Sequence, residues 1–298
     1  MTPPPKVASS EAIRHHYDQS NEFFALWLDP TMCYSCAMWE EGVADLETAQ
    51  TRKLDYHLEQ AGLNAGGTVL DVGCGWGGII GRAVERFGAS QAVGLTLSLA
   101  QHDWITAHPH PAVEVRLENW TDHRPTQRYD AITSVGAFEH FAQVDSTAED
   151  RLRTYAAFFR RCREWLIPGG RLSLQTFAYA SAKTRERNRQ SAGTQFLASN
   201  IFPETDPPLL TEILTAAEDS FEVIRLRNDR LDYARTCEVW LERLSRRRAE
   251  AVELVGEKLV DRFATYLKLS HLGFAVGELH LYRVTLQATT GRKARAGF

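Results

Sequence analysis

Through the middle of the chain, short apolar segments alternate with segments whose apolar residues recur at helical spacing. The short segments are rich in β-branched residues and are bounded by glycine or polar residues, which predicts strands. They are Thr68–Val72, Gln91–Thr96, Val113–Leu117, Tyr129–Val135 and Arg171–Tyr179. Helices are predicted between them, for example over Leu99–Ala107 and Ala148–Leu166. Strands that alternate with helices are typical of a doubly wound, mostly parallel α/β sheet.

The patterns on either side of this alternation extend the predicted domain. Helical spacing of apolar residues predicts N-terminal helices over Glu11–Leu28 and Leu46–Leu63. After the fifth strand, a polar stretch with several prolines breaks the alternation and predicts a helical lid insertion. Further helices and two closing strands, which make the sheet seven-stranded, are predicted over Leu209–Ala217, Phe221–Leu226, Ala234–Val255, Glu257–Gly273 and Leu279–Leu286.

The length of 298 residues suits one core with an insertion, and we predict a single domain over residues 11–288. Residues 1–10, with three consecutive prolines, are expected to be a mobile lead-in, and residues 289–298 a basic, frayed tail. Within the domain we expect N-terminal helices (11–66), a cofactor-binding core (67–179), the lid insertion (180–220), and C-terminal strands and helices (221–288).

Composition excludes several classes of protein. The net charge of −4 argues against nucleic-acid binding, and no apolar run is long enough to span a bilayer. The five cysteines are an odd number, so we expect no disulfide framework and place the chain in the reducing cytoplasm. Cys33 and Cys36 have the spacing of metal ligands, but no second cysteine or histidine pair completes a site, and no metal is expected.

The stretch 69–78, VLDVGCGWGG, joins the first predicted strand to a helix through a glycine-rich turn, which suits a nucleotide at a helix N-terminus. A dinucleotide fold usually has an acid at the end of its second strand, and Thr96-Leu97 stand there instead, which disfavours a dehydrogenase. Gln101 is positioned to bind ribose hydroxyls, and Trp120 offers an indole for an adenine. Asp71 is expected to orient the amides of the turn.

Several motifs, in order along the chain, resemble the cyclopropane-fatty-acid synthases and their mycolic-acid relatives. They lie at residues 16–24, 34–37, 70–78, 93–98, 135–141, 201–203 and 233–236. That family consists of S-adenosylmethionine-dependent methyltransferases with the Rossmann-like class I fold. The resemblance implies a set of residues that contact the cofactor, to which we add Asp71 and Trp76 from the glycine-rich motif. The set is Tyr34, Ser35, Asp71, Gly73, Gly75, Trp76, Thr96, Leu97, Gln101 and Trp120.

The resemblance also implies the chemistry. In this family a carbon–carbon double bond attacks the methyl group, and a bound bicarbonate removes a proton from the resulting cation. Its holders correspond to Cys36, Glu139, Ile201 and Tyr233, and Gln175 stands where the family has a histidine. Gln can donate a hydrogen bond but cannot carry a positive charge, so either bicarbonate or Glu139 itself takes the proton.

Other departures from the family pattern leave the acceptor open. Thr121 replaces an acid, Glu204-Thr205 a glycine pair, and Ser270 a cysteine. We expect methyl or methylene transfer to a carbon of an apolar, alkene-bearing lipid or small molecule, with transient contact to a membrane surface or a carrier protein. A small-molecule N-methyltransferase and an inactive cofactor-binding subunit remain alternatives. Glu139 could instead be a helix-start carboxylate, and Tyr233 a core residue.

Overall fold

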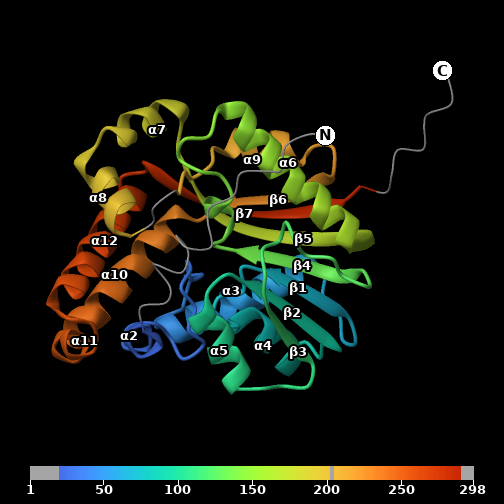
Figure 1. Cartoon of the computed structure of the whole chain (residues 1–298), viewed down its shortest axis with the longest axis horizontal. Helices are drawn as coiled ribbons and strands as arrows, with labels where there is room; N and C mark the ends of the chain where they lie inside the picture. The colour runs from blue at the N-terminus through green and yellow to red at the C-terminus, as the bar shows by residue number, and fades with distance from the viewer. Residues whose placement is uncertain (1–19, 202–204, 290–298) are drawn as a thin grey trace.

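The computed structural model describes residues 20–201 and 205–289. Its seven strands form one sheet in the order β3-β2-β1-β4-β5-β7-β6 (Figure 1). Strands β1 to β5 are parallel, and β7 runs antiparallel to both β5 and β6. The strands are β1 Thr68–Val72, β2 Gln91–Thr96, β3 Val113–Leu117, β4 Tyr129–Val135, β5 Leu166–Tyr179, β6 Phe221–Asn228 and β7 Leu279–Ala288. The predicted doubly wound, mostly parallel, seven-stranded sheet is confirmed.

Alternate residues of the central strands face two separate cores, because successive side chains of a strand point to opposite faces. Val69, Ala92 and Ala131 pack under α3 (Leu46–Ala61), α4 (Gly78–Glu85) and α5 (Leu99–Ala107). Their neighbours Leu70, Val93 and Ile132 pack under α6 (Ala148–Trp165) and α9 (Leu210–Ala217). The strand pattern read from the sequence therefore reflects burial on both faces.

A third core lies beside one end of the sheet. The helices that enclose it are α2 Asn21–Ala25, α10 Arg230–Arg246, α11 Arg248–Val255 and α12 Glu257–Ala275. We call it the aromatic core, because it contains Phe23, Trp27, Trp240 and Phe263. Figure 1 shows α10, α11 and α12 together at the left of the sheet, with α7 (Ala182–Arg189) and α8 (Ala192–Asn200) above them. The insertion is thus helical and adjoins the aromatic core.

Several predicted elements have different bounds, and the largest differences lie in three parts of the chain. The helix expected to end at Leu166 ends at Trp165, and β5 starts at Leu166 with its turn residues inside a bulge opposite β4. The helix expected over Ala234–Val255 begins at Arg230 and divides at Arg247, whose φ of −108° and ψ of 24° are not helical. Of the helix expected over Glu11–Leu28, residues 11–19 lie outside the described residues, and α2 covers Asn21–Ala25, capped by Ser20.

Within residues 20–201 and 205–289, no helix has both the length and the apolar character needed to cross a bilayer. The same part of the chain has no group of three or more histidine, cysteine or acidic side chains arranged to hold a metal ion. All five cysteines are buried free thiols.

Candidate functional site

In the glycine-rich turn between β1 and α4, one glycine packs closely against a neighbouring residue and another borders open space. Gly73 has φ 83°, and a Cβ there would lie 2.4 Å from the Cβ of Ala137. Its amide and that of Cys74 both donate to the carbonyl of Leu95, at 3.0 and 2.9 Å. Gly75 has φ 54°, and a Cβ there would meet no protein atom within 4 Å. Gly73 is therefore required by packing, whereas Gly75 borders empty space.

That space is a cavity at the carboxyl ends of β1, β2 and β4, the usual place for a ligand in such a sheet. Every residue predicted to bind the cofactor lines it. These are Tyr34, Ser35, Asp71, Gly73, Gly75, Trp76, Thr96, Leu97, Gln101 and Trp120. Residues that are distant in sequence, from the loop after α2 to the loop after β3, thus meet around one cavity.

Two polar features of the cavity fit an adenosyl group. The Thr96 hydroxyl donates to Gln101 Oε1 at 2.7 Å, which leaves the Gln101 amide N–H groups available to a ligand. The indole N–H of Trp120 is buried without a hydrogen-bond partner, although its ring packs against Phe141 and Phe158. A buried donor without a partner is costly, so a ligand acceptor at this position would be stabilising.

The expected role of Asp71 is wrong. The amides of the turn are held by the Leu95 carbonyl, and Asp71 Oδ1 accepts a hydrogen bond from the Thr133 hydroxyl at 2.8 Å. Burial raises the pKa of the Asp71 carboxyl to about 7. Asp71 still lines the cavity.

Ionisable residues outside the predicted set also line the cavity, among them Lys53 and His140. Lys53 lines it from α3 and donates to the Ser35 hydroxyl at 3.0 Å. His140 lines it from the short 3-10 helix after β4, and its Nδ1 hydrogen-bonds the Thr205 hydroxyl at 2.8 Å. Burial lowers the pKa of His140 to about 4, so this imidazole is neutral. A lysine on the buried face of a predicted helix was the available signal for Lys53.

None of the five residues predicted to be catalytic lines this cavity. Cys36, Glu139, Gln175 and Ile201 are each at most 3% exposed, and Tyr233 is partly buried. Ile201 packs in the aromatic core near Tyr233 and has no polar side-chain atom to offer a ligand. Burial raises the pKa of Tyr233, and Cys36 and Glu139 are near enough to raise it further. These three side chains therefore lie in one region of the protein.

Glu139 is the acid of the predicted catalytic set, and it lies next to the cavity, because Ala137 and His140 in the same segment both line it. Its carboxyl group accepts hydrogen bonds from the Thr176 hydroxyl at 3.0 Å and the Phe177 amide at 3.4 Å. Burial raises its pKa to about 7, against the effect of these donors. A carboxyl with such a pKa exchanges protons near neutral pH, as a general base must. The two β5 contacts were missed by the sequence reading.

Gln175 takes part in a buried network beside the site. Its Oε1 accepts from Arg283 Nε at 2.8 Å and lies 3.2 Å from His57 Nε2, and its amide nitrogen donates to the Cys36 carbonyl at 3.4 Å. His57 Nδ1 lies 2.8 Å from the Ser173 hydroxyl. Both ends of the Gln175 amide therefore have protein partners.

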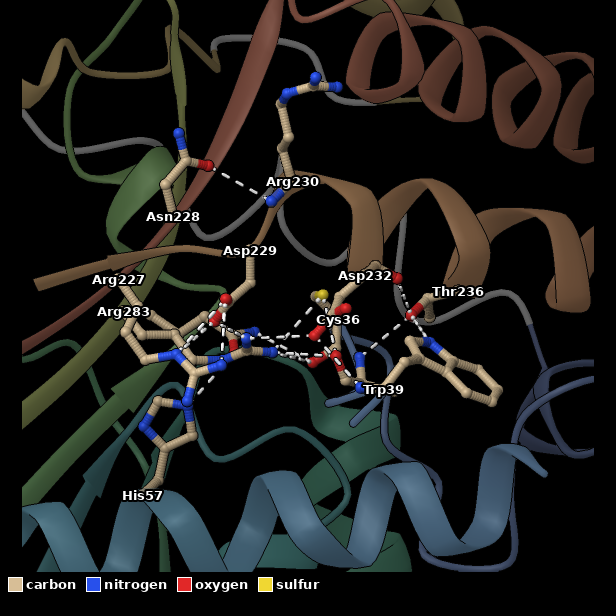
Figure 2. A network of polar contacts seen from close by, with 12 residues as sticks. Cys36, Trp39, His57, Arg227, Asn228, Asp229, Arg230, Asp232, Thr236 and Arg283 are labelled. Atoms are coloured by element: carbon tan, nitrogen blue, oxygen red, sulfur yellow. Dashed lines mark hydrogen bonds and ion pairs between the residues drawn. The ribbon is translucent and has the colours of Figure 1, made fainter. Parts of the chain in front are cut away.

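Arg283, fully buried on β7 directly opposite Gln175 in the strand pairing, is the hub of this network (Figure 2). It also donates to the carbonyl of Ala37 at 2.9 Å and forms an ion pair with Asp229. Asp232 Oδ2 lies 3.7 Å from the same guanidinium. One side chain thus connects β5, the loop that contains Cys36, and the start of α10, where Tyr233 lies. Arg283 is the only lysine, arginine or acidic residue within β7, which was the sequence signal for it.

Replacing Arg283 with lysine is expected to lower the free energy of unfolding by about 2 kcal/mol, because an ammonium cannot reproduce the fork of N–H donors. Urea unfolding measures the change. The matched control is Arg246→Lys, at an exposed ion pair with Glu242, where the change should stay within about 0.5 kcal/mol. Equal stability of the Arg283→Lys variant and the unmodified chain would contradict the role of Arg283 as a hub.

Aromatic side chains connect the cavity to the catalytic set. Tyr34, which lines the cavity, has its ring centre 5.3 Å from that of Trp240, which lies 6.2 Å from Tyr233. Tyr233 stacks on Phe274 at 4.4 Å and lies 6.4 Å from Phe177. Such a wall excludes water and presents ring faces that favour a nearby positive charge.

The chain matches the family model for mycolic acid cyclopropane synthetase over residues 5–284. It is 35% identical over 272 residues to cyclopropane mycolic acid synthase 2 of Mycobacterium leprae, covering 86% of this chain and 87% of that protein. The cyclopropane synthase MmaA2 from Mycobacterium tuberculosis superposes with a TM-score of 0.85 at 32% identity, covering 94% of this chain and 99% of that one. The mycolic acid cyclopropane synthase CmaA1, complexed with SAH and CTAB, gives 0.85 at 30% identity, covering 95% and 99%.

Proposed function

Because the chain belongs to the mycolic acid cyclopropane synthetase family of S-adenosylmethionine-dependent methyltransferases, we propose that it adds a one-carbon unit to a carbon–carbon double bond in a lipid acyl chain. The product is a cyclopropane or a methyl branch. Membership in this family confirms the prediction made from the motifs, and the similar solved structures confirm the Rossmann-like class I fold. The observation that carries the proposed reaction is the position of Glu139, a buried acid behind the cofactor cavity and beside the aromatic wall.

The residues around the cavity suit the cofactor. We assign the adenosyl group to the region of Thr96, Gln101 and Trp120, and the amino-acid end to the region of Ser35 and Gly73. When bound, S-adenosylmethionine supplies a methyl group that is electrophilic because it is attached to a sulfonium sulfur, and an alkene that accepts it becomes a carbocation. The role of the protein is then to exclude water and to remove one proton.

We assign proton removal to Glu139. Its pKa of about 7 leaves a substantial fraction ionised at neutral pH, and the hydroxyl of Thr176 orients the carboxylate. A bound bicarbonate is the competing acceptor. The contacts of Gln175 favour Glu139 over bicarbonate as the proton acceptor. The side-chain oxygen of Gln175 accepts from Arg283, and its amide nitrogen donates to the Cys36 carbonyl. Gln175 would have to leave these partners to hold an anion.

The test of this function is mass spectrometry of products made from S-adenosylmethionine. Unsaturated acyl chains are offered as phospholipid vesicles, as thioesters of a carrier protein, and as free acids, with an amine panel alongside. Gain of one CH2 unit on an acyl chain supports the proposal, and the productive form identifies the partner. Methylation of amines alone would indicate the N-methyltransferase alternative. Binding of S-adenosylhomocysteine without any product would indicate an inactive subunit.

We further propose that α7 and α8 form a lid connected to the cofactor cavity. Thr205, at the far end of this insertion, hydrogen-bonds His140 in the cavity wall, and its backbone forms a bridge with Gln143. The α7 end of the insertion is its fixed base, because Arg185 of α7 forms a buried ion pair with Glu212 at 2.6 Å, and α8 is the part left to move. A lid with a fixed base and a contact to the cavity is positioned to respond to the ligand.

Hydrogen exchange tests the lid. We expect exchange over Ala192–Asn200 to slow by about tenfold when S-adenosylhomocysteine binds, because closure stabilises a helix that otherwise opens locally. The edge strand Phe221–Asn228, none of whose residues lines the cavity, serves as the control and should exchange at an unchanged rate. Identical rates over Ala192–Asn200 with and without ligand would show that the insertion does not respond to the cofactor.

A further inference from the structure

Helix α3 presents a row of buried polar side chains to the site. Gln50, Lys53 and His57 are spaced three and four residues apart, so they lie on one face of the helix. Gln50 donates to the carbonyls of Cys33 and Ser35, at 3.3 and 3.0 Å, and so holds the loop that contains Cys36. His57 joins the Arg283 network. Lys53, between them, is the member of this row that lines the cofactor cavity.

The charge of Lys53 is buried without a matching carboxylate. The residue is 1% exposed, and among residues 20–201 and 205–289 no ion pair joins its ammonium to an acid. Its hydrogen-bond partner is the Ser35 hydroxyl, at 3.0 Å. The carboxyl of Asp71 is close enough for Lys53 to lower its pKa, but burial dominates and keeps that pKa near 7. A buried charge whose hydrogen-bond partner is a neutral hydroxyl, and which has no ion pair, is unfavourable, so an anionic group at the cavity would complete this arrangement.

The proposed orientation of the cofactor identifies that group. With the adenosyl end at Trp120, the amino-acid end lies toward Ser35 and Gly73, on the side of Lys53. The α-carboxylate is the anionic group of S-adenosylmethionine. We propose that Lys53 binds this carboxylate, with the Ser35 hydroxyl as a second donor. The Ser35 hydroxyl oxygen accepts a hydrogen bond from Lys53, so its O–H group can donate to the carboxylate. The inference rests on the proposed function for its ligand.

Two ligands that differ by one carboxylate test this assignment by calorimetry. S-adenosylhomocysteine carries the group, and its decarboxylated analogue, S-adenosyl-3-thiopropylamine, keeps the adenosyl, sulfur and amine. The unmodified chain should bind the analogue about 10- to 100-fold more weakly, because a charge-assisted hydrogen bond in a buried site is lost. Lys53→Met should weaken S-adenosylhomocysteine by a similar factor and change the affinity of the analogue by less than about threefold.

The matched control is Lys258→Met at an exposed position of α12, which should leave both affinities unchanged. Equal affinity of the unmodified chain for the two ligands would overturn the proposal without needing any variant to fold. An equal loss for both ligands in Lys53→Met, with an intact melting transition, would likewise overturn it and give Lys53 a structural role. No binding of either ligand to the unmodified chain would instead refute the assigned cofactor.

Discussion

Replacing Gly75 by valine is expected to abolish binding of S-adenosylhomocysteine while the chain still folds. The unmodified chain should bind this ligand in the micromolar range, which corresponds to about −8 kcal/mol. Gly75 lines the cavity, and a Cβ there meets no protein atom within 4 Å, so the added side chain would occupy ligand volume. A loss of at least about 100-fold is expected in calorimetry, equivalent to about 3 kcal/mol.

Gly42→Val is the matched control, because Gly42 also has a positive φ (82°) and open space around its Cβ position, but lies outside the cavity. Both variants carry the same kind of backbone strain, so both should lose similar stability. Binding should fail only in Gly75→Val. Unchanged affinity of that variant for S-adenosylhomocysteine, or tight binding of NAD by the unmodified chain, would contradict the assigned cavity.

Glu139→Gln is expected to lower turnover by roughly a hundredfold or more with little change in cofactor affinity, because the amide keeps the shape but cannot accept a proton. The variant should be at least as stable as the unmodified chain at pH 8. A carboxyl whose pKa is raised to about 7 by folding destabilises the fold progressively as pH rises from its unfolded pKa toward 7. Glu149→Gln, at an exposed position of α6, is the control for the loss of a charge.

The pH profile and dissolved bicarbonate separate the two possible proton acceptors. If ionised Glu139 is the base, the rate should rise with pH through about 7 and then level off. Removal of bicarbonate should leave that rate unchanged, whereas a fall would favour the bound ion. Full activity of Glu139→Gln on the acceptor would exclude Glu139 both as the base and as the holder of a bicarbonate.

The elements predicted best from the sequence are those that are buried enough for their residues to be mainly apolar. Among the first four strands, which all have the predicted bounds, β1, β2 and β4 have apolar residues packed on both faces, as at Val69 and Leu70. The predicted bounds differ from the observed ones where local backbone geometry competes with the hydrophobic pattern. The turn at Pro168–Gly170 is absorbed into β5 as a bulge, and Arg247 divides a helix whose apolar spacing continues through it.

Candidate residues on the strand ends could be predicted because a parallel sheet places those ends around one cavity. Contacts between distant side chains could not. Nothing local to Arg283 predicts that it pairs with Gln175 and holds the Ala37 carbonyl, since these contacts depend on the antiparallel register of β7. Lys53 was missed for a related reason, because the loop that contains its partner Ser35 has no periodic pattern to place it.

The cross-strand contact between Gln175 and Arg283 also constrains how this chain can change over generations. Arg283 donates to Gln175, and both side chains donate to the Cys36 carbonyl, so the energetic effect of a substitution at either position depends on the residue at the other. A histidine at position 175 would place an imidazole between the buried guanidinium of Arg283 and the imidazole of His57. Substitution of Gln175 is therefore expected to be tolerated only together with a change at position 283 or 57.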